Sequence, residues 1–246
     1  MHLFTKKHKN KEIVKETVAK PEHIDIAQIY NQEFYDGQAR TSYKSAKKVI
    51  KIVHQIIPNI KSVLDVGCGV GTWMKAWKDV DSEINVYGID ANELPDEALY
   101  VDRKYIEIAD LENLQVNKNR YDIVESLEVG EHLSESAANS YVDFLCAASD
   151  LILFSAALPK QTGDHHINEQ YPEYWNKKFR KERFKCFDIL RQGIWNDDDI
   201  SWWYRQNIMI YARGKSAQFL KKKGFSSTEI VNTYYHPELV KMYTGV

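Results

Sequence analysis

The sequence has few cysteines and no CxxC pair. Cys68, Cys146 and Cys186 cannot form a closed set of disulfides, which excludes a disulfide-stapled scaffold. Long apolar runs are also lacking: the best, residues 151–158, is far shorter than the about 20 apolar residues that cross a membrane. The chain turns basic within its first residues, so no signal peptide is expected.

An excess of charge of either sign is lacking too. The chain has 33 basic and 35 acidic residues, a net charge of −2. Nucleic-acid binding through bulk electrostatics is therefore not expected, because it depends on Lys and Arg neutralising phosphates. Hydrophobic residues form 43% of the 246 residues and aromatic residues 12%, which excludes global disorder. These features predict a cytoplasmic, enzyme-sized protein without a membrane span.

Composition and periodicity predict four parts. Residues 1–20 are a basic lead-in, expected to be flexible, and residues 21–60 form a helical cap with a loop at residues 34–40. The core occupies residues 61–213, and residues 214–246 form an appendage with one short helix at 215–223 and no assignable end. The cap is predicted to be either a lid over the site or a homodimer contact.

Short β-rich runs alternate with helical segments through the core, which is typical of a parallel sheet covered on both faces. The last two strands are too close together for a crossover helix, so an antiparallel last strand is expected. The sequence predicts an α/β fold with a mostly parallel seven-stranded sheet. The expected strands are 62–66, 86–89, 105–108, 122–126, 151–155, 184–189 and 208–212, and the expected helices of the core are 72–77, 136–148 and 173–179.

A glycine-rich turn joins the first strand to the next helix. Gly67, Gly69 and Gly71 are spaced G-x-G-x-G, and Thr72 replaces the third glycine of a dinucleotide fingerprint. Glycine permits positive φ and close backbone approach, so the turn can present its amides to a ligand. By itself it equally fits a tight strand-to-helix connection.

Two aspartates end the next two strands. Asp90 can accept hydrogen bonds from both hydroxyls of an adenosine ribose, and Asp110 can meet an adenine amine. Because the carboxyl ends of parallel strands share one edge of a sheet, the glycine turn and both aspartates predict one adenosine-containing ligand.

These motifs, with residues 121–133, resemble those of the class I S-adenosylmethionine-dependent methyltransferases over about residues 60–213. The resemblance implies a Rossmann-like fold, S-adenosylmethionine (SAM) as cofactor and S-adenosylhomocysteine (SAH) as product. It places the three glycines at the methionine part, Asp90 on the ribose, Asp110 and Leu111 beside the adenine, and Leu127 and Glu128 at the sulfonium. The expected cofactor site consists of Asp65, Gly67, Gly69, Gly71, Thr72, Trp73, Asp90, Ala91, Asp110, Leu111, Leu127 and Glu128.

Two other classes of enzyme are less favoured. An NAD-dependent enzyme would have the third glycine, and aminopropyl transfer would need more acidic residues to hold a polyamine. Members of the methyltransferase family often have leucine where this chain has Gly130, so a more open turn is expected there.

Two histidine-bearing segments follow the fourth and fifth strands. Methyl transfer requires an acceptor that is positioned and deprotonated, and histidine, with an ordinary pKa of about 6.5, suits the base. His165 and His166 are the preferred candidates, with Glu128 and His132 as weaker ones. No metal is expected, because adjacent side chains seldom point at one ion and no second cluster is evident.

Aromatic and amide-rich segments at residues 168–175 and 202–207 suit stacking on sugars and hydrogen bonding to hydroxyls or phosphates. These segments resemble those of bacterial methyltransferases of surface-polysaccharide and capsule synthesis, which implies O-methylation of a sugar or nucleotide-linked sugar. N-methylation of a small amine and a non-catalytic binding protein remain open. The expected acceptor contacts are Tyr35, Arg40, Glu131, Asn168, Tyr171, Trp175, Trp203, Arg205 and Asn207.

Overall fold

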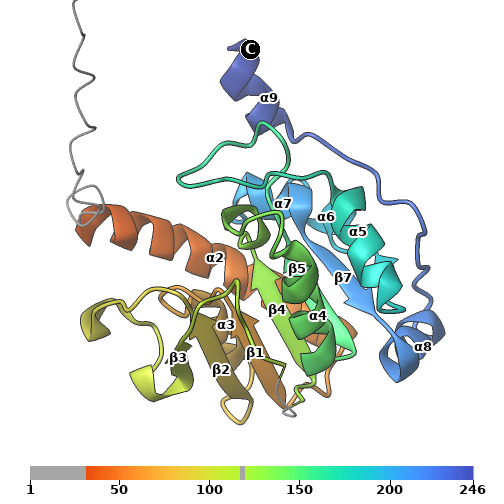
Figure 1. The fold of residues 1–246 in the computed structure, drawn as a ribbon, viewed down its shortest axis with the longest axis horizontal. Coiled ribbons are helices and arrows are strands. Elements are labelled where there is room, and N and C mark those ends of the chain that lie inside the picture. Colours follow the sequence, from red (N-terminus) through yellow and green to blue (C-terminus); the bar gives the residue numbers. More distant parts are fainter. Residues whose placement is uncertain (1–31, 117–119, 246) are drawn as a thin grey trace, which may run out of the picture.

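Seven strands form one sheet in the computed structural model, which describes residues 32–116 and 120–245, with side chains of the first helix from residue 39 onward (Figure 1). The strands are β1 (Ser62–Val66), β2 (Asn85–Asp90), β3 (Ile106–Ile108), β4 (Ile123–Leu127), β5 (Leu151–Ser155), β6 (Lys185–Phe187) and β7 (Met209–Ala212). The α-helices are α2 (Gln32–Ile56), α3 (Thr72–Val80), α4 (Ala138–Ala148), α5 (Pro172–Lys181), α6 (Arg191–Ile194), α7 (Trp202–Asn207), α8 (Gly214–Lys222) and α9 (Pro237–Thr244). Short 3-10 helices are η1 (Asp96–Ala98), η2 (Arg103–Tyr105) and η3 (Gly130–His132).

The strand order is β3-β2-β1-β4-β5-β7-β6. Strands β1 to β5 pair in parallel, and β7 runs antiparallel to both β5 and β6. The predicted mostly parallel seven-stranded sheet with an antiparallel last strand is confirmed. Asp65 of β1 pairs in register with Glu125 of β4, which places two acidic residues side by side in the sheet.

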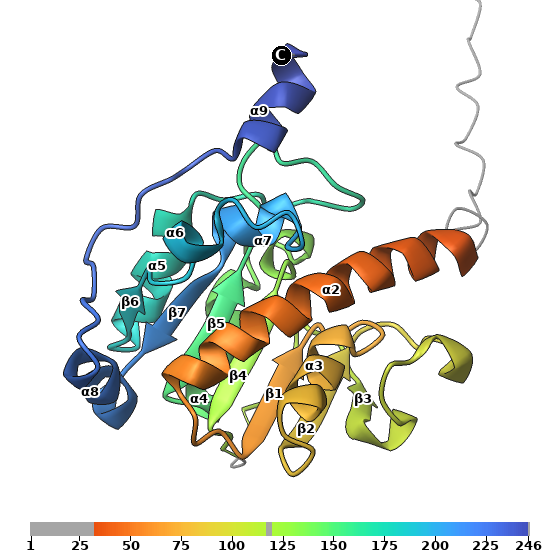
Figure 2. The ribbon, with the colours of Figure 1, turned by 180° about the vertical axis from the view of Figure 1, so that it is seen from behind.

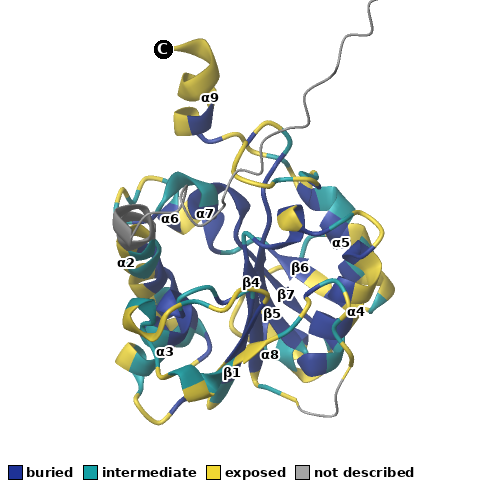
Figure 3. Ribbon diagram, turned by 60° about the vertical axis from the view of Figure 1, so that its left-hand side comes forward, coloured by how far each residue is buried: buried dark blue, intermediate teal, exposed yellow. Residues whose placement is uncertain are grey.

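Helices cover both faces of the sheet, and each face has its own apolar cluster. Figure 2 shows α2 and α3 on one face, and Figure 1 shows α4 and α5 on the other. Alternate residues of β5 supply the two clusters: Leu153 packs with the α2 and α3 side, whereas Ile152 and Phe154 pack with α4 and α5. Strands covered on both faces are expected to be apolar throughout, and Figure 3 shows β4 and its neighbours as a buried layer.

One prediction about the cap is wrong. Residues 34–40, expected to form a loop, lie within the continuous helix α2. A single interior glycine, Gly37, costs a helix only about 1 kcal/mol, and packing of Val49 and Val53 against the core outweighs it. Residues 1–31 lie outside the described part, and so does the side chain of Tyr35.

The C-terminal part differs from expectation by one helix. Helix α8 lies where residues 215–223 were predicted to be helical, and α9 forms in the segment without an assignment. Pro237 at its first position and the His236 side chain, which accepts a hydrogen bond from the Glu238 amide, start this helix. Among the described residues, no helix is both long and apolar enough to span a membrane.

Candidate functional site

A cavity of about 560 Å³ opens at the carboxyl ends of β1 and β4. Its volume lies within the range of about 300–1,000 Å³ that is usual for small-molecule sites. The strand order reverses at β1, which is where open α/β sheets bind ligands. The glycine turn, the end of β4, the loop after β5 and helix α7 line the cavity, together with Ser42 of α2 and Met242 of α9.

The glycine turn forms one wall. A Cβ atom on Gly67 would lie 2.3 Å from Val129 Cγ2, and its φ of 82° suits only glycine, so this position is fixed by packing. Gly69, also at positive φ, has no atom within 4 Å of the Cβ position and faces open space. Gly67 and Gly69 line the cavity; Gly71 does not, because it packs against Val101.

Asp90 closes the turn from β2. Its Oδ2 accepts a hydrogen bond from the Gly69 amide at 2.7 Å, and its Oδ1 accepts one from the Asn92 amide at 2.9 Å. The predicted meeting of the β1 and β2 ends is thus confirmed. Asp90 does not itself line the cavity, and neither does Ala91; Leu94 reaches the cavity from this segment instead.

Asp110 and Leu111, expected beside the adenine, lie outside the cavity lining. The Asp110 side chain binds its own turn, accepting hydrogen bonds from Asn113 Nδ2 at 2.7 Å and the Glu112 amide at 2.9 Å. The bond from Asn113, and then that from Glu112, lowers the pKa of Asp110. Leu111 is buried in the apolar cluster beneath α4.

Asp65 and Glu125 form a pair of buried carboxyl groups below the cavity. Trp77 Nε1 donates to Glu125 Oε2 at 2.9 Å, whereas Asp65 Oδ2 and Glu125 Oε1 have no hydrogen-bond partner. Burial raises the pKa of Glu125 to about 8. Burial, and then the charges of Glu125 and Asp90, raise the pKa of Asp65 well above its ordinary value. Asp65 also lines the cavity, so one member of the pair faces the ligand space.

Glu128 follows the end of β4 in a strained conformation. Its φ is 58°, in a region that costs a non-glycine residue about 1–3 kcal/mol, and such residues cluster at functional sites. Its carboxylate accepts hydrogen bonds from Asn207 Nδ2 at 3.1 Å and Gln161 Nε2 at 2.7 Å. Burial raises its pKa, and the bonds from Asn207, Ser155 and Gln161 oppose that rise.

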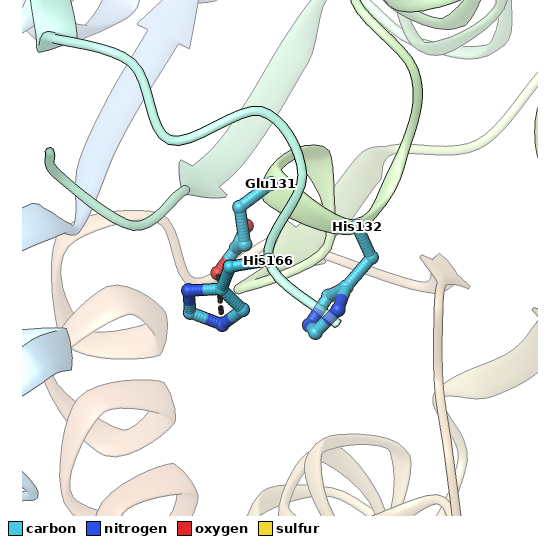
Figure 4. Close-up of side chains that lie close together, drawn as sticks. All are labelled: Glu131, His132 and His166. Atoms are coloured by element: carbon cyan, nitrogen blue, oxygen red, sulfur yellow. Dashed lines mark ion pairs between the residues drawn. The ribbon is translucent and has the colours of Figure 1, made fainter. Parts of the chain in front are cut away.

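Glu131, His132 and His166 lie together at the cavity (Figure 4). The backbone amides of Ile167 and Asn168 both donate to the Glu131 carbonyl at 2.9 Å, which holds the two histidine-bearing segments side by side. The expectation of no second cluster is therefore wrong. His165, the other preferred base, is exposed and lies outside the lining, at a φ of 57°.

The pKa values of Glu131 and His132 are shifted in opposite directions. Burial, and then the Glu128 charge, raise the pKa of Glu131 well above its ordinary value, while the amides of Glu131 and Ala157 oppose the rise. Desolvation, and then His166, lower the pKa of His132, although this residue is exposed at the surface. The surroundings thus favour the neutral forms of both groups.

Trp175, expected to stack on the acceptor, lies in the core. Its indole occupies the space beside Gly130, where a Cβ atom would come within 2.8 Å of Trp175 Cη2. The expectation of a more open turn at Gly130 is therefore wrong, because the ring from α5 fills the space that a leucine would take. Trp203, in contrast, lines the cavity.

Other expected acceptor residues do not reach the cavity. Arg205 is buried and paired with Asp198 and Glu238. Asn207 reaches the site through hydrogen bonds to Glu128 and Gln161. Three further residues lie off the lining: Asn168, which is buried, and Arg40 and Tyr171, which are exposed.

Several lining residues were not predicted. Gln161 links Glu128 to helix α7, because its Oε1 accepts hydrogen bonds from Asn207 Nδ2 at 2.8 Å and from Gln206 Nε2 at 3.2 Å. Its position in a polar loop after the fifth strand was the signal that could have identified it. Met242 had no such signal, because the C-terminal helix lay in a segment without an assignment.

The sheet order, the glycine turn and the rim cavity define a Rossmann-like fold of the class I methyltransferase type. Residues 35–188 match the family of methyltransferase domains, and the chain belongs to this family. The prediction of SAM as the cofactor agrees with that membership. No curated protein matches the chain.

Solved structures share the fold at low sequence identity. DesVI of Streptomyces venezuelae is 13% identical, with a TM-score of 0.54 over 80% of this chain and 100% of its own. SAM-bound CalS10, an amino pentose methyltransferase of Micromonospora echinaspora involved in calicheamicin biosynthesis, is 13% identical, with a TM-score of 0.54 over 75% and 98%. SAM-bound magnesium protoporphyrin IX methyltransferase of Synechocystis is 18% identical, with a TM-score of 0.54 over 75% and 86%.

Proposed function

We propose that this protein is a SAM-dependent methyltransferase that methylates a hydroxyl of a small polar acceptor, namely a sugar of a bacterial surface polysaccharide. One observation carries the proposal: a single cavity has the glycine turn on one wall and the carboxylates and imidazoles of the β4 and β5 loops on the other. The methyl group passes from the sulfonium to the acceptor oxygen, the hydroxyl proton passes to a base, and SAH leaves.

The part of the cavity assigned to the cofactor has an acidic group that complements the positive charge of the cofactor. Asp65 is a buried carboxyl group at the cavity, and no lysine or arginine of the described residues lines it. The ammonium group of the methionine part would supply the missing positive charge. Asp90 lies outside the cavity lining, and each of its oxygens accepts one backbone amide hydrogen bond, so each has a lone pair left for a ribose hydroxyl of a cofactor that extends beyond the lining.

The acceptor side contains two groups that can take the proton. His166 presents an imidazole, and Glu128 presents a carboxylate whose pKa is raised by burial. Carboxylates accept hydrogen bonds from sugar hydroxyls, and Trp203 offers an aromatic face nearby. Among residues 39–116 and 120–245 no cationic side chain lines the cavity, so a nucleotide-linked sugar would keep its phosphates outside.

The acidic lining also favours a second candidate, N-methylation of a small amine. Asp65, Glu128, Glu131 and Asp164 all line the cavity, and a protonated amine would be attracted to them. An amino sugar combines both acceptor types and would discriminate between them by the atom that is methylated.

Two measurements test the proposal. Isothermal titration should show SAH binding to the purified chain, and labelled SAM should methylate members of a panel of sugars, nucleotide-linked sugars and amines. Transfer to amines alone would replace the hydroxyl proposal by the second candidate. SAH binding without transfer to any acceptor would indicate a non-catalytic binding protein, and no SAH binding would overturn the cofactor assignment.

A further inference from the structure

Three potential metal ligands converge at the cavity from two separate segments. The ligand atoms of Glu131, His132 and His166 all lie within 4.8 Å of one another. Glu131 and His132 come from η3, and His166 comes from the loop after β5 (Figure 4). Glu131 Oε1 lies 4.0 Å from His166 Nε2, and the two imidazole rings meet edge to face at 4.8 Å.

Glu131 is the group that lacks a partner. Its side chain has no solvent exposure, and neither carboxylate oxygen has a hydrogen-bond partner of normal geometry. A buried carboxylate without a partner is costly unless a cation or a proton neutralises it. No lysine or arginine among the described residues lines this cavity, so the positive charge has to come from the neighbouring imidazoles or from a bound cation.

Glu169, which is not part of the cluster, orients the His166 ring as a metal ligand. Its Nδ1 lies 3.0 Å from Glu169 Oε1, so this nitrogen donates and Nε2 keeps its lone pair on the side of Glu131. The amides of Lys160 and Thr162 donate to Glu169 at 2.8 and 2.7 Å and fix that carboxylate in turn. A carboxylate that orients a histidine in this way is the usual outer-shell arrangement of metal sites.

We propose that Glu131, His132 and His166 bind one divalent transition-metal ion, with free coordination positions facing the cavity. Two imidazoles and one carboxylate suit ions from Mn²⁺ to Zn²⁺, whereas Ca²⁺ and Mg²⁺ prefer oxygen ligands alone. Bonds of about 2.1 Å place ligand atoms roughly 3–4 Å apart, so side-chain rotations close the observed spacing.

The consequence for catalysis depends on the proposed function. A metal-bound His166 has no lone pair for a proton, which leaves Glu128 as the free base. The ion would also bring positive charge to a cavity lined by carboxylates, and its free positions would accept oxygens of the acceptor. Metal binding itself requires neither the cofactor nor the acceptor.

The test measures metal binding directly. The full chain, stripped with EDTA, is titrated with Mn²⁺ by electron paramagnetic resonance and with Zn²⁺ by calorimetry, and Mg²⁺ serves as the comparison ion. The expected result is one site per chain with Mn²⁺ and Zn²⁺ bound more tightly than Mg²⁺. Glu169→Gln should weaken binding about 10–100-fold, and His166→Ala and His132→Ala should weaken it further.

His165→Ala is the matched control, because this histidine is adjacent in sequence and lies outside the cavity. Its metal affinity should equal that of the wild type, and circular dichroism should show all variants to be folded. Absence of Mn²⁺ and Zn²⁺ binding, or equal losses in His165→Ala and His166→Ala, would overturn the inference. A chain that binds metal but not SAH would refute the proposed function and leave this site intact.

Discussion

Two groups of buried acidic residues lie near the carboxyl ends of β1 and β4, and their surroundings differ. Asp65 and Glu125 lie within the sheet, where the Trp77 indole donates a hydrogen bond to Glu125. Glu128 and Glu131 lie beyond the strand end, beside amides and two histidines. Neither group has a lysine or arginine in the described cavity lining, so a proton, a neighbouring imidazole or a cation from outside the protein must neutralise the buried carboxyl groups.

The difference indicates which cation each group accepts. At Asp65 only one carboxyl group faces the cavity, which suits an ammonium group. At Glu131 two imidazoles add nitrogen ligands, which suits a transition metal. A buried carboxyl group is thus assigned as a cofactor contact in one place and as a metal ligand in the other, because its neighbours differ.

The largest expected effect comes from Glu128→Gln. Removing the base should lower kcat about 10²–10⁴-fold, because a neutral amide cannot accept the acceptor's proton. Glu125→Gln, the same substitution three residues earlier within β4, should leave kcat near the wild-type value. Initial rates with labelled SAM measure both; equal losses would show that the two acidic groups do not differ in the way described.

Asp65→Asn should weaken SAH binding. A hydrogen bond to a charged group contributes about 1.5–3 kcal/mol, which corresponds to roughly 10–150-fold in the dissociation constant. Glu131→Gln is the control from the other group, and its SAH affinity should be unchanged in EDTA-treated protein. Calorimetric titration with SAH measures both, and a larger loss in Glu131→Gln would reverse the assignment of the two groups.

Trp77→Phe should destabilise the fold. It removes the donor to Glu125 and leaves that buried carboxyl group without a partner, at about 1–3 kcal/mol in the free energy of unfolding, besides the lost volume. Trp175→Phe is the matched control, because Trp175 is equally buried and its Nε1 has no partner. Urea unfolding compares them; an equal cost would mean that the Trp77 hydrogen bond contributes nothing.

The sheet and the glycine turn were predictable because their signals are local. β-rich runs, their spacing and Gly67 are properties of consecutive residues, and the strands formed where they were expected. The strand after Phe184 was shorter than predicted, since pairing with β7 covers only Lys185–Phe187.

The rim cluster was not predictable in the same way. Glu131 and His166 are far apart in sequence, and the hydrogen bonds that join their segments run between backbones. The prediction for Trp175 was wrong for a related reason. Its ring packs into the space that Gly130 leaves because glycine has no side chain, and this contact joins two segments that are distant in sequence. Polar residues after strand ends identified the region, but only the fold decides which of them face the cavity.

The last effect, small for each pH unit, distinguishes the two acidic groups by the pH dependence of stability. Folding raises the pKa of Glu125 from 4.5 to about 8, so between these values the folded state holds a proton that the unfolded state has released. Stability should therefore fall as pH rises through this window, by at most about 1.4 kcal/mol per pH unit for this group. Glu125→Gln removes its contribution and should flatten the slope of the unfolding free energy in urea, measured from pH 5 to 8 on EDTA-treated, SAH-free protein. A slope as steep as that of the wild type would mean that Glu125 is ionised in the folded chain, and the contrast between a protonated Glu125 within the sheet and the ligand-binding carboxylates that face the cavity would then fail.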